Sequence, residues 1–330
     1  MQALVITKFD DNFKYIEVQD CPIPKPENGE VLIRIEVSSL SPADSLLIRN
    51  AYIKSLSLPA IPGLFGIGSI VESGGGIMGK FLKGKRVLFE AKLEKGGAWA
   101  EYAIADANIC FPIGDIVPQD GLSIGNTITA MGMLDVSKKI GAKSIVMSAA
   151  AGSLGRFVNM YFPQKNMNVI SIIRSQKQRE ILESIGAKYI LNQKDEDFED
   201  KLSQLTTELK STVAFDSVGG SLPRKLMRTL PKHSTIFSIG NLSGRDVEID
   251  PTKDMMRKMQ KYQTFVVPEW LDKQSFPRKM LTLSKARKIA SSLGEKNSIR
   301  KTVTLQQTAQ EMSDLFTDTS AGVVLVCPAK

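Results

Sequence analysis

Residues 148–155 read Ser148-Ala149-Ala150-Ala151-Gly152-Ser153-Leu154-Gly155, between an apolar run with the pattern of a strand and a segment with the pattern of a helix. Small residues at such a turn let backbone N–H groups approach a pyrophosphate at the start of a helix, where the helix dipole favours negative charge. A glycine match alone is weak evidence, but the flanking strand and helix are the context that the motif requires. The stretch therefore predicts a dinucleotide site, with a tight turn that binds no ligand as the alternative. The cofactor contacts expected here are Ala150, Gly152, Ser153, Leu154 and Gly155.

The chain after this turn alternates short apolar runs with amphipathic helices. The strands predicted from residue 144 onward are Ser144–Ser148, Val169–Ile173, Tyr189–Leu191, Val213–Ser217, Thr235–Ile239 and Thr264–Val267. The helices predicted between them include Gln176–Ile185, with Ser175 as N-cap, and Leu222–Thr229, with Ser221 as N-cap. Strand–helix alternation is typical of βαβ units, so we predict an α/β fold with a doubly wound parallel sheet.

The end of the second predicted strand indicates which cofactor is bound. NAD-binding units usually place Asp or Glu about 20 residues after the glycines, where the carboxylate holds the ribose 2′-OH. Here Arg174 follows Gly155 by 19 residues, and Ser175 and Lys177 come after it. A guanidinium pairs with phosphate oxygens and a carboxylate would repel them, so we predict NADP(H) bound by these residues. The alternative is that Arg174 is a solvated charge at a strand end. The further cofactor contacts expected at or beyond strand ends are Gly219, Gly240 and Val266.

The first hundred residues and the tail have a different pattern. Short strands such as Val31–Val37 and Arg86–Glu90, separated by Pro- and Gly-rich segments, predict a barrel-like β domain. The tail is expected to fold back onto this domain as a strand, a helix and a strand. The boundaries predicted are 1–120 for the first part of the β domain, 121–280 for the dinucleotide-binding domain and 281–330 for the return.

The composition excludes several classes of protein. The chain has 330 residues with 42 % hydrophobic and 24 % charged side chains, which is ordinary for a globular protein. No apolar run reaches the roughly 18–20 residues of a membrane span. The N-terminus reads as a strand rather than a targeting segment, so we expect a cytoplasmic protein. With one histidine and three scattered cysteines, we predict no zinc or other metal site.

The net charge of +8 is concentrated in one part of the chain. Residues 251–301 hold 13 Lys and Arg and 4 Asp and Glu. This basic segment is interpreted as a solvated pair of helices, with a docking face for an acidic protein partner as the alternative. No aromatic interleaving or nucleic-acid motif accompanies it, so nucleic acid is not expected as a partner.

Several motifs occur in an order typical of one family. They are Ser41-Pro42-Ala43-Asp44, Arg49 with Tyr52, Ile61-Pro62-Gly63, Gly97-Ala98-Trp99-Ala100-Glu101-Tyr102, residues 148–155 and Asp216-Ser217-Val218-Gly219-Gly220. Together they resemble the medium-chain dehydrogenase/reductase superfamily in its zinc-free quinone oxidoreductase branch. The resemblance implies a GroES-like β-barrel catalytic domain with an inserted Rossmann domain. It also implies a homodimer joined through Rossmann edge strands, which here would be Thr264–Val267.

The resemblance also implies roles for individual residues. Tyr52 matches a proton donor or polar anchor of the related enoyl reductases, with packing as the alternative. Asn126 and Thr129 match positions that line the nicotinamide side of the cleft in related enzymes. The alternative is that they are polar residues at the start of a helix. Asp44 is favoured as a helix cap rather than a catalytic acid because Ser41–Asp44 has the Ser-x-x-acid form of a helix start. Phe65 replaces a family acid in the sequence Pro62-Gly63-Leu64-Phe65-Gly66.

Three functions remain open on the sequence. The leading hypothesis is a zinc-independent, NADPH-dependent oxidoreductase that transfers a hydride to a quinone or α,β-unsaturated carbonyl compound. The second is a trans-2-enoyl thioester reductase acting on a CoA- or carrier-linked substrate, which Tyr52 and Asn126–Ala130 favour. The third is a non-catalytic binding or structural protein that keeps the dehydrogenase fold.

Overall fold

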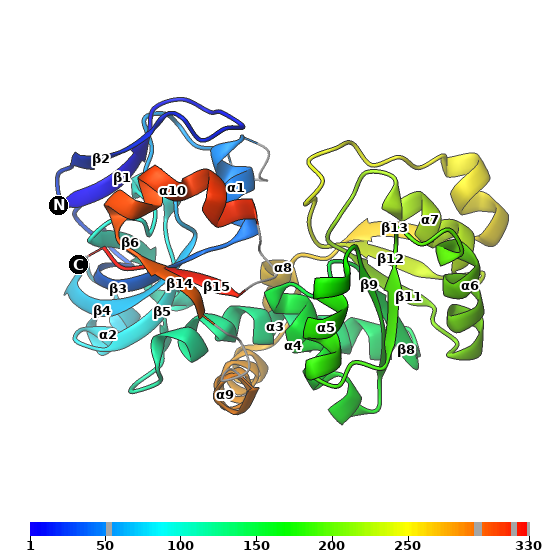
Figure 1. The fold of residues 1–330 in the computed structure, drawn as a ribbon. Helices are drawn as coiled ribbons and strands as arrows, with labels where there is room; N and C mark the ends of the chain where they lie inside the picture. The colour runs from blue at the N-terminus through cyan, green and yellow to red at the C-terminus, as the bar shows by residue number, and fades with distance from the viewer. Residues whose placement is uncertain (51–54, 294–298, 318–321, 329–330) are drawn as a thin grey trace. The chain divides into compact units, whose positions relative to one another are not determined.

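The computed structural model describes residues 1–50, 55–293, 299–317 and 322–328. The chain forms two compact units (Figure 1). Unit 1 combines Met1–Ile124 with Arg287–Lys330, and unit 2 is Gly125–Ala286.

Unit 2 contains a six-stranded parallel sheet. Its strands are β8 (Ser144–Met147), β9 (Asn168–Ile173), β10 (Tyr189–Asn192), β11 (Val213–Asp216), β12 (Thr235–Ser238) and β13 (Lys261–Thr264). The order across the sheet is β10-β9-β8-β11-β12-β13, and every neighbouring pair is parallel. When the strands are numbered along unit 2, this is the 3-2-1-4-5-6 order of a doubly wound dinucleotide-binding fold. Successive strands are added on one side of the first strand and then, from the fourth strand on, on its other side. The predicted α/β fold class is confirmed.

Helices connect these strands or flank them along the chain. Those between strands are α4 (Ser153–Tyr161), α5 (Gln176–Ser184), α6 (Phe198–Glu208) and α7 (Leu222–Thr229), with short turns η3 (Pro163–Lys165), η4 (Pro251–Met255) and η5 (Met256–Lys258). Helix α3 (Pro118–Lys139) precedes β8, and α8 (Val267–Asp272) and α9 (Phe276–Leu293) follow β13. Apolar side chains of α6 and α7 form one buried cluster with those of the sheet, and its members include Leu202, Leu226, Ile170 and Ala214. The first five strands carry apolar residues on both faces, so this part of the sheet is buried. Ser171, a buried polar residue within β9, donates its hydroxyl hydrogen to Asn159 Oδ1 at 2.8 Å.

Unit 1 is rich in antiparallel strands, as its Pro- and Gly-punctuated sequence predicts. Its strands are β1 (Gln2–Ile6), β2 (Ile16–Asp20), β3 (Glu30–Leu40), β4 (Phe65–Ser73), β5 (Arg86–Glu90), β6 (Tyr102–Asp106), β7 (Phe111–Pro112), β14 (Ile299–Val303) and β15 (Val323–Val326). Its helices and short turns are α1 (Pro42–Ile48), α2 (Ile77–Leu82), η1 (Leu93–Lys95), η2 (Ala107–Ile109) and α10 (Leu305–Thr317). The C-terminal strands β14 and β15 extend the sheet of β3, β4, β5 and β7, so the tail completes the N-terminal unit.

Two local predictions are wrong. The sixth strand of unit 2 is Lys261–Thr264 and not Thr264–Val267, because Val267 already starts helix α8. Pro268 has no N–H to donate to a strand ladder, and its ring suits the first turn of a helix, so the chain leaves the sheet before it. Asn126 and Thr129 do not form a polar helix start, since both lie well inside α3.

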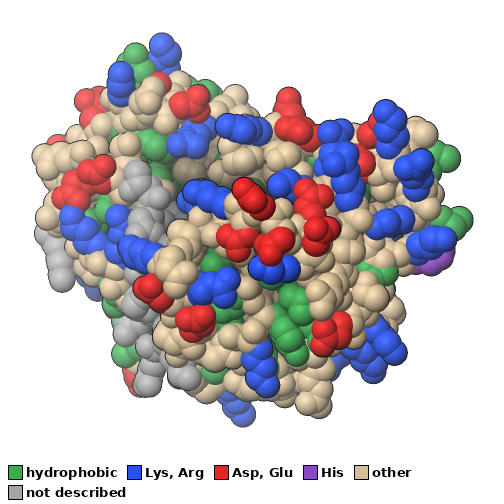
Figure 2. All heavy atoms as spheres, turned by 45° about the vertical axis from the view of Figure 1, so that its right-hand side comes forward, with side chains coloured by type: hydrophobic (Ala, Val, Ile, Leu, Met, Phe, Trp, Pro, Cys, Tyr) green, Lys and Arg blue, Asp and Glu red, His purple; other side chains and the backbone are tan. Residues whose placement is uncertain are grey.

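The basic segment is not a pair of helices. It contains the short turns η4 and η5, strand β13 and the helices α8 and α9. Figure 2, which brings the right-hand side of Figure 1 forward, shows Lys and Arg side chains interspersed with Asp and Glu on that face. The cationic side chains visible there therefore do not form an unbroken positive surface. None of the helices that the structure describes is both long and apolar enough to cross a lipid bilayer.

Candidate functional site

The predicted phosphate turn is built as a tight connection between β8 and α4. The N–H of Gly152 donates to the oxygen of Ala149 at 3.0 Å, and the N–H of Ala150 donates to Ile172 of the neighbouring strand at 3.2 Å. A Cβ at Gly155 would lie 2.4 Å from the oxygen of Ala150, so only glycine lets the helix pack this closely on the turn. The first N–H groups of α4 have no helical partner and point out of its N-terminus, which is the geometry that an anion needs.

The five residues predicted in this turn do not have the same exposure. Gly152, Ser153 and Leu154 are partly exposed, whereas Ala150 and Gly155 are buried. Only the first three have atoms that face solvent at this turn. The two buried residues instead allow the close approach of strand and helix.

Asn126 is held against the start of α4. Its Nδ2 donates to Ser153 Oγ at 2.8 Å, so α3 is tied to the phosphate turn. Thr129 lies one turn further along α3, and its hydroxyl donates to the oxygen of Gly125 at 2.9 Å. Of these two predicted residues, Asn126 therefore contacts the turn, whereas the Thr129 hydroxyl is hydrogen-bonded within its own helix.

A buried carboxylate links the carboxyl ends of β8 and β11, where the order of the sheet reverses. Ser148 Oγ donates to Asp216 Oδ1 at 2.7 Å, and the N–H groups of Val218 and Gly219 donate to the same carboxylate at 3.0 and 2.9 Å. The N–H of Ser217 donates in turn to Ser148 Oγ at 2.8 Å. Burial raises the pKa of Asp216, and these hydrogen bonds oppose the rise. Asp216 thus fixes the turn that carries Gly219.

Asp216 and Ser148 were not among the site residues predicted from the sequence. The available signal was a single charged residue at the end of an otherwise apolar strand, directly before two glycines. Both glycines adopt positive φ, at +70° for Gly219 and +59° for Gly220. That conformation explains why glycine is required after the carboxylate.

Next to this turn lies a cavity of about 460 Å³. Its lining residues follow strands β9, β10, β11 and β12: Arg174, Gln193, Lys194, Val218, Gly219, Gly220, Ser221, Leu222, Lys225, Leu242, Ser243 and Arg245. Four of them are cationic and none is acidic. The cavity opens outside the carboxyl ends of the parallel strands, where ligands bind in open α/β sheets. Its charge fits a phosphate-bearing ligand.

The residues around Arg174 divide into two groups. Arg174 lines the cavity, and its backbone N–H donates to Gln178 Oε1 at 2.9 Å. Ser175 caps α5, because its Oγ accepts from the N–H of Gln178 at 3.4 Å, as predicted. Lys177 is exposed and is not among the residues that line the cavity. Ser221 is the N-cap residue of α7, as predicted, but makes no capping hydrogen bond through its side chain.

The remaining predicted residues lie apart from this cavity or outside the described residues. Gly240 follows β12, where an added Cβ would lie 3.5 Å from the oxygen of Ser217. Val266 is the N-cap residue of α8 and is not among those lining the cavity. Tyr52, the predicted catalytic residue, lies outside the residues that the structure describes.

In unit 1, Asp44 has the structural role that was favoured. The N–H and Oγ of Ser41 donate to Asp44 Oδ2 at 2.8 and 2.6 Å, and the N–H of Leu64 donates to Oδ1 at 2.9 Å. Burial raises the pKa of Asp44 to about 6, against the opposing effect of these hydrogen bonds. Asp44 therefore connects the start of α1 with the loop before β4, and the neighbouring Phe65 is partly exposed.

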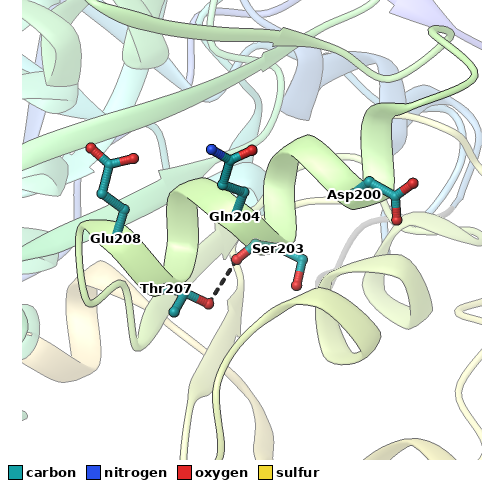
Figure 3. A pocket seen from close by; sticks show the side chains of 5 residues that line it. All are labelled: Asp200, Ser203, Gln204, Thr207 and Glu208. Carbon is teal, nitrogen blue, oxygen red and sulfur yellow. Dashed lines mark hydrogen bonds between the residues drawn. The ribbon is translucent and has the colours of Figure 1, made fainter.

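A second hollow, of about 540 Å³, carries no site. Its five lining residues, Asp200, Ser203, Gln204, Thr207 and Glu208, all come from α6 (Figure 3). The hydroxyl of Thr207 donates to the backbone oxygen of Ser203 at 2.8 Å. Because no second element contributes a lining residue, nothing there would enclose a ligand.

Two family models match the chain. The alcohol dehydrogenase GroES-like domain matches residues 27–115, and the model described as zinc-binding dehydrogenase matches residues 153–286. Within the described residues, no three His, Cys, Asp or Glu side chains are grouped where they could hold a metal ion.

Individual relatives agree with these models. Prostaglandin reductase-3 of Mus musculus is 28% identical over 247 residues, which are 74% of this chain and 64% of that protein. The mitochondrial enoyl-[acyl-carrier-protein] reductase of Bos taurus is 23% identical over 86% of this chain and 78% of that protein. A crystal structure from Mesorhizobium loti, assigned as an NADPH:quinone reductase, superimposes with a TM-score of 0.90 at 27% identity, over 99% of this chain and 98% of that one.

The chain thus spans less than two thirds of the length of the mouse relative, 64%, but nearly all of the bacterial structure. The strand order of unit 2, the glycine turn and both family models point the same way. The chain belongs to the medium-chain dehydrogenase/reductase superfamily, in its quinone oxidoreductase-like branch.

Proposed function

We propose that this protein is an NADPH-dependent oxidoreductase that transfers a hydride to a quinone or an α,β-unsaturated carbonyl acceptor without zinc. The observation that carries the proposal is the cavity beside Gly219, which has four cationic side chains and no carboxylate among its lining residues. A ribose 2′-phosphate is the group that distinguishes NADPH from NADH, and it requires such positive surroundings. The name of the Mesorhizobium loti neighbour supports the same cofactor.

The residues that would hold the cofactor come from several strand ends. The N–H groups at the start of α4 suit the pyrophosphate, since Gly152, Ser153 and Leu154 are partly exposed there. The 2′-phosphate is assigned to the cationic set, which consists of Arg174, Lys194, Lys225 and Arg245. By the family resemblance, Asn126 and Thr129 are assigned to the nicotinamide side.

Hydride transfer of this kind requires few catalytic side chains from the protein. Reduced nicotinamide, when bound, supplies the hydride. When the acceptor gains a hydride at carbon, negative charge develops on its oxygen, and one hydrogen-bond donor there stabilises that charge. We assign this donor to Tyr52, whose hydroxyl proton would pass to the acceptor oxygen.

NADPH oxidation across a panel of quinones and enones tests this function. We expect turnover with at least one acceptor and slower turnover with NADH. Tight NADPH binding with no turnover on any acceptor would instead support the non-catalytic hypothesis. If neither nucleotide binds, the cavity assignment is wrong.

The second candidate is a trans-2-enoyl thioester reductase, which the similarity to the bovine enoyl reductase and the resemblance of Asn126–Ala130 to an element of such reductases favour. Both candidates share the cofactor site and differ in the acceptor. Turnover of an enoyl-CoA that exceeds turnover of quinones, and that is lost in Tyr52→Phe, would select the thioester reductase.

We also propose that two copies of the chain pair through the free edge of β13. Among the described residues, this strand pairs only with β12, and Lys261, Gln263 and Thr264 are exposed along it. An exposed strand edge is a template for pairing with another chain. Light scattering should show a dimer that Gln263→Pro converts to monomer, and a wild-type monomer would contradict the proposal. A cytoplasmic location and an acidic partner for the basic segment remain predictions from the sequence.

A further inference from the structure

Helix α2 of unit 1 presents two large apolar side chains to solvent. Ile77 is 91% exposed and Phe81 is 65% exposed. Residues four apart lie side by side on one face of a helix, so these two form a continuous apolar surface. On the other side Leu82 is only 2% exposed, and a Cβ at the buried Gly79 would lie 2.5 Å from Ser73 Oγ. The helix is therefore anchored by its inner face while Ile77 and Phe81 protrude.

A third exposed apolar side chain comes from the element packed against α2. Turn η2 packs against α2, and its Ile109 is 41% exposed. We call Ile77, Phe81 and Ile109 the α2 patch. Solvent-exposed Ile and Phe side chains that are grouped rather than scattered mark an interaction site.

The sequence around the α2 patch is cationic. From Ser73 to Phe89 it contains Lys80, Lys83, Lys85 and Arg86 and no Asp or Glu. Arg86 is engaged with Glu36 through two hydrogen bonds, and the Lys85 ammonium lies 3.4 Å from the centre of the Phe81 ring. Lys80 and Lys83 are exposed. The nearest carboxylates along the chain belong to Glu72 and Glu90, which directly flank this stretch. Asp106 precedes η2, and its carboxylate accepts the N–H of Asn108.

We propose that the α2 patch docks on the surface of an anionic phospholipid bilayer. Apolar side chains flanked by lysines match the layered chemistry of such a surface, in which acyl chains lie just beneath negatively charged headgroups. Ile77 and Phe81 enter the boundary between headgroups and acyl chains, and Lys80 and Lys83 remain at the headgroups. The proposal concerns unit 1 alone and does not depend on the cofactor or acceptor of the proposed reaction.

The positive charge around the α2 patch favours an anionic bilayer over a second copy of this chain as the binding partner. A second copy of this chain would bring further lysines to Lys80 and Lys83 if it paired through the same patch, and like charges at an interface are unfavourable. Protruding side chains on a helix surface also suit a yielding surface better than a rigid one, which would need a matching hollow. An anionic bilayer meets both requirements.

Sedimentation with lipid vesicles tests the proposal on the full chain. One set of vesicles is phosphatidylcholine alone, and the other contains roughly 30% phosphatidylserine, a level at which each basic residue contributes about fivefold in binding. We expect binding to the anionic vesicles that weakens with salt and is at least tenfold weaker to neutral ones. The variant Ile77→Ser/Phe81→Ser should lose at least tenfold in binding, and Lys80→Gln/Lys83→Gln should lose binding and most of the salt dependence.

Matched controls make the outcomes decisive. Ile140→Ser removes an apolar side chain that is 42% exposed in unit 2 and should bind like wild type. Lys253→Gln/Arg257→Gln removes two charges of the basic segment and should also bind like wild type. The proposal is overturned if wild type binds no vesicles, if Ile77→Ser/Phe81→Ser binds as wild type does, or if the basic-segment variant alone abolishes binding. It is also overturned if Ile77→Ser/Phe81→Ser dissociates a dimer in the absence of lipid, because a second copy would then cover the patch.

Discussion

Single buried carboxylates organise both units, and their surroundings give them opposite pKa shifts. Asp44 and Asp216 are held mainly by backbone N–H and hydroxyl groups, so burial dominates and raises the pKa of each. Glu30 is equally buried but lies against two ammonium groups, Lys92 at 2.5 Å and Lys95 at 2.7 Å. Burial would raise the pKa of Glu30, yet the hydrogen bonds from both lysines hold it at about 2. The difference between these residues is the presence of a cationic partner.

The Glu30 cluster predicts a loss of stability in acid. A carboxyl whose pKa is lowered by folding stabilises the protein above its ordinary value of about 4.5, and this contribution disappears as the pH falls toward 2. Glu30→Gln should therefore lower the free energy of unfolding by about 1–3 kcal/mol at pH 7 and by little near pH 2. Urea unfolding at a series of pH values measures this. Glu27→Gln, which removes the exposed partner of Lys95, should have almost no effect, and an equal effect of both variants would contradict the account.

Asp44 predicts the opposite trend with pH. Because its pKa is raised to about 6 in the folded protein, its contribution to stability is largest below the unfolded pKa near 4 and is lost as the pH rises through 6. Asp44→Asn should remove that decline between pH 4 and pH 7, while lowering stability overall because Asn cannot accept all three hydrogen bonds. A decline of the same size in wild type and Asp44→Asn would show that another group is responsible.

At the scale of elements, the sequence predicts what depends on local pattern and misses what depends on distant partners. The first five strands of unit 2 and helix α5 with its Ser175 cap follow from periodicity and capping residues, and they agree with the structure within a residue or two. The sixth strand was misplaced because Val266 and Val267 look like strand residues, whereas Pro268 ends the ladder. Lys194, Lys225 and Arg245 could not be predicted as one cavity, because they lie on three connections whose convergence depends on the strand order. Asp216 was missed for the same reason, since its partner Ser148 is 68 residues away.

Two glycines in unit 2 test the packing of the phosphate turn. Gly155→Ala places a Cβ 2.4 Å from the oxygen of Ala150, so we expect a loss of about 1–3 kcal/mol and weaker nucleotide binding. Gly125 lies inside α3, and a Cβ there meets nothing within 4 Å. Gly125→Ala should therefore raise stability by about 0.5–1 kcal/mol through helix propensity. Thermal unfolding of both variants measures the contrast, and equal shifts in the same direction would contradict it.

At the scale of the whole molecule, the chain combines a unit built from both of its ends with an inserted parallel sheet. The order 3-2-1-4-5-6 brings the glycine turn after β8 and the Asp216 turn after β11 to one edge, although 60 residues separate them. The same order gathers the four cationic residues from separate connections. Under the proposed function, specificity for the phosphorylated cofactor depends on the sheet topology rather than on one motif, and the preference for NADPH should decrease stepwise as single charges are removed.

The cationic set makes a quantitative prediction about cofactor choice. Each charged hydrogen bond to a phosphate contributes about 1.5–3 kcal/mol, which corresponds to roughly a 10- to 100-fold change in affinity. Arg174→Met and Arg245→Met should each weaken NADPH binding by at least tenfold and leave NADH binding nearly unchanged. Lys188→Met, an exposed lysine that does not line the cavity, should change neither.

The most direct test of the central claim is a fluorescence titration of the full chain with NADPH and with NADH under the same conditions. We predict that NADPH binds at least tenfold more tightly than NADH, and that Arg174→Met/Arg245→Met removes the difference. Equal affinities of the wild-type protein for the two nucleotides, or a preference for NADH, would contradict the account.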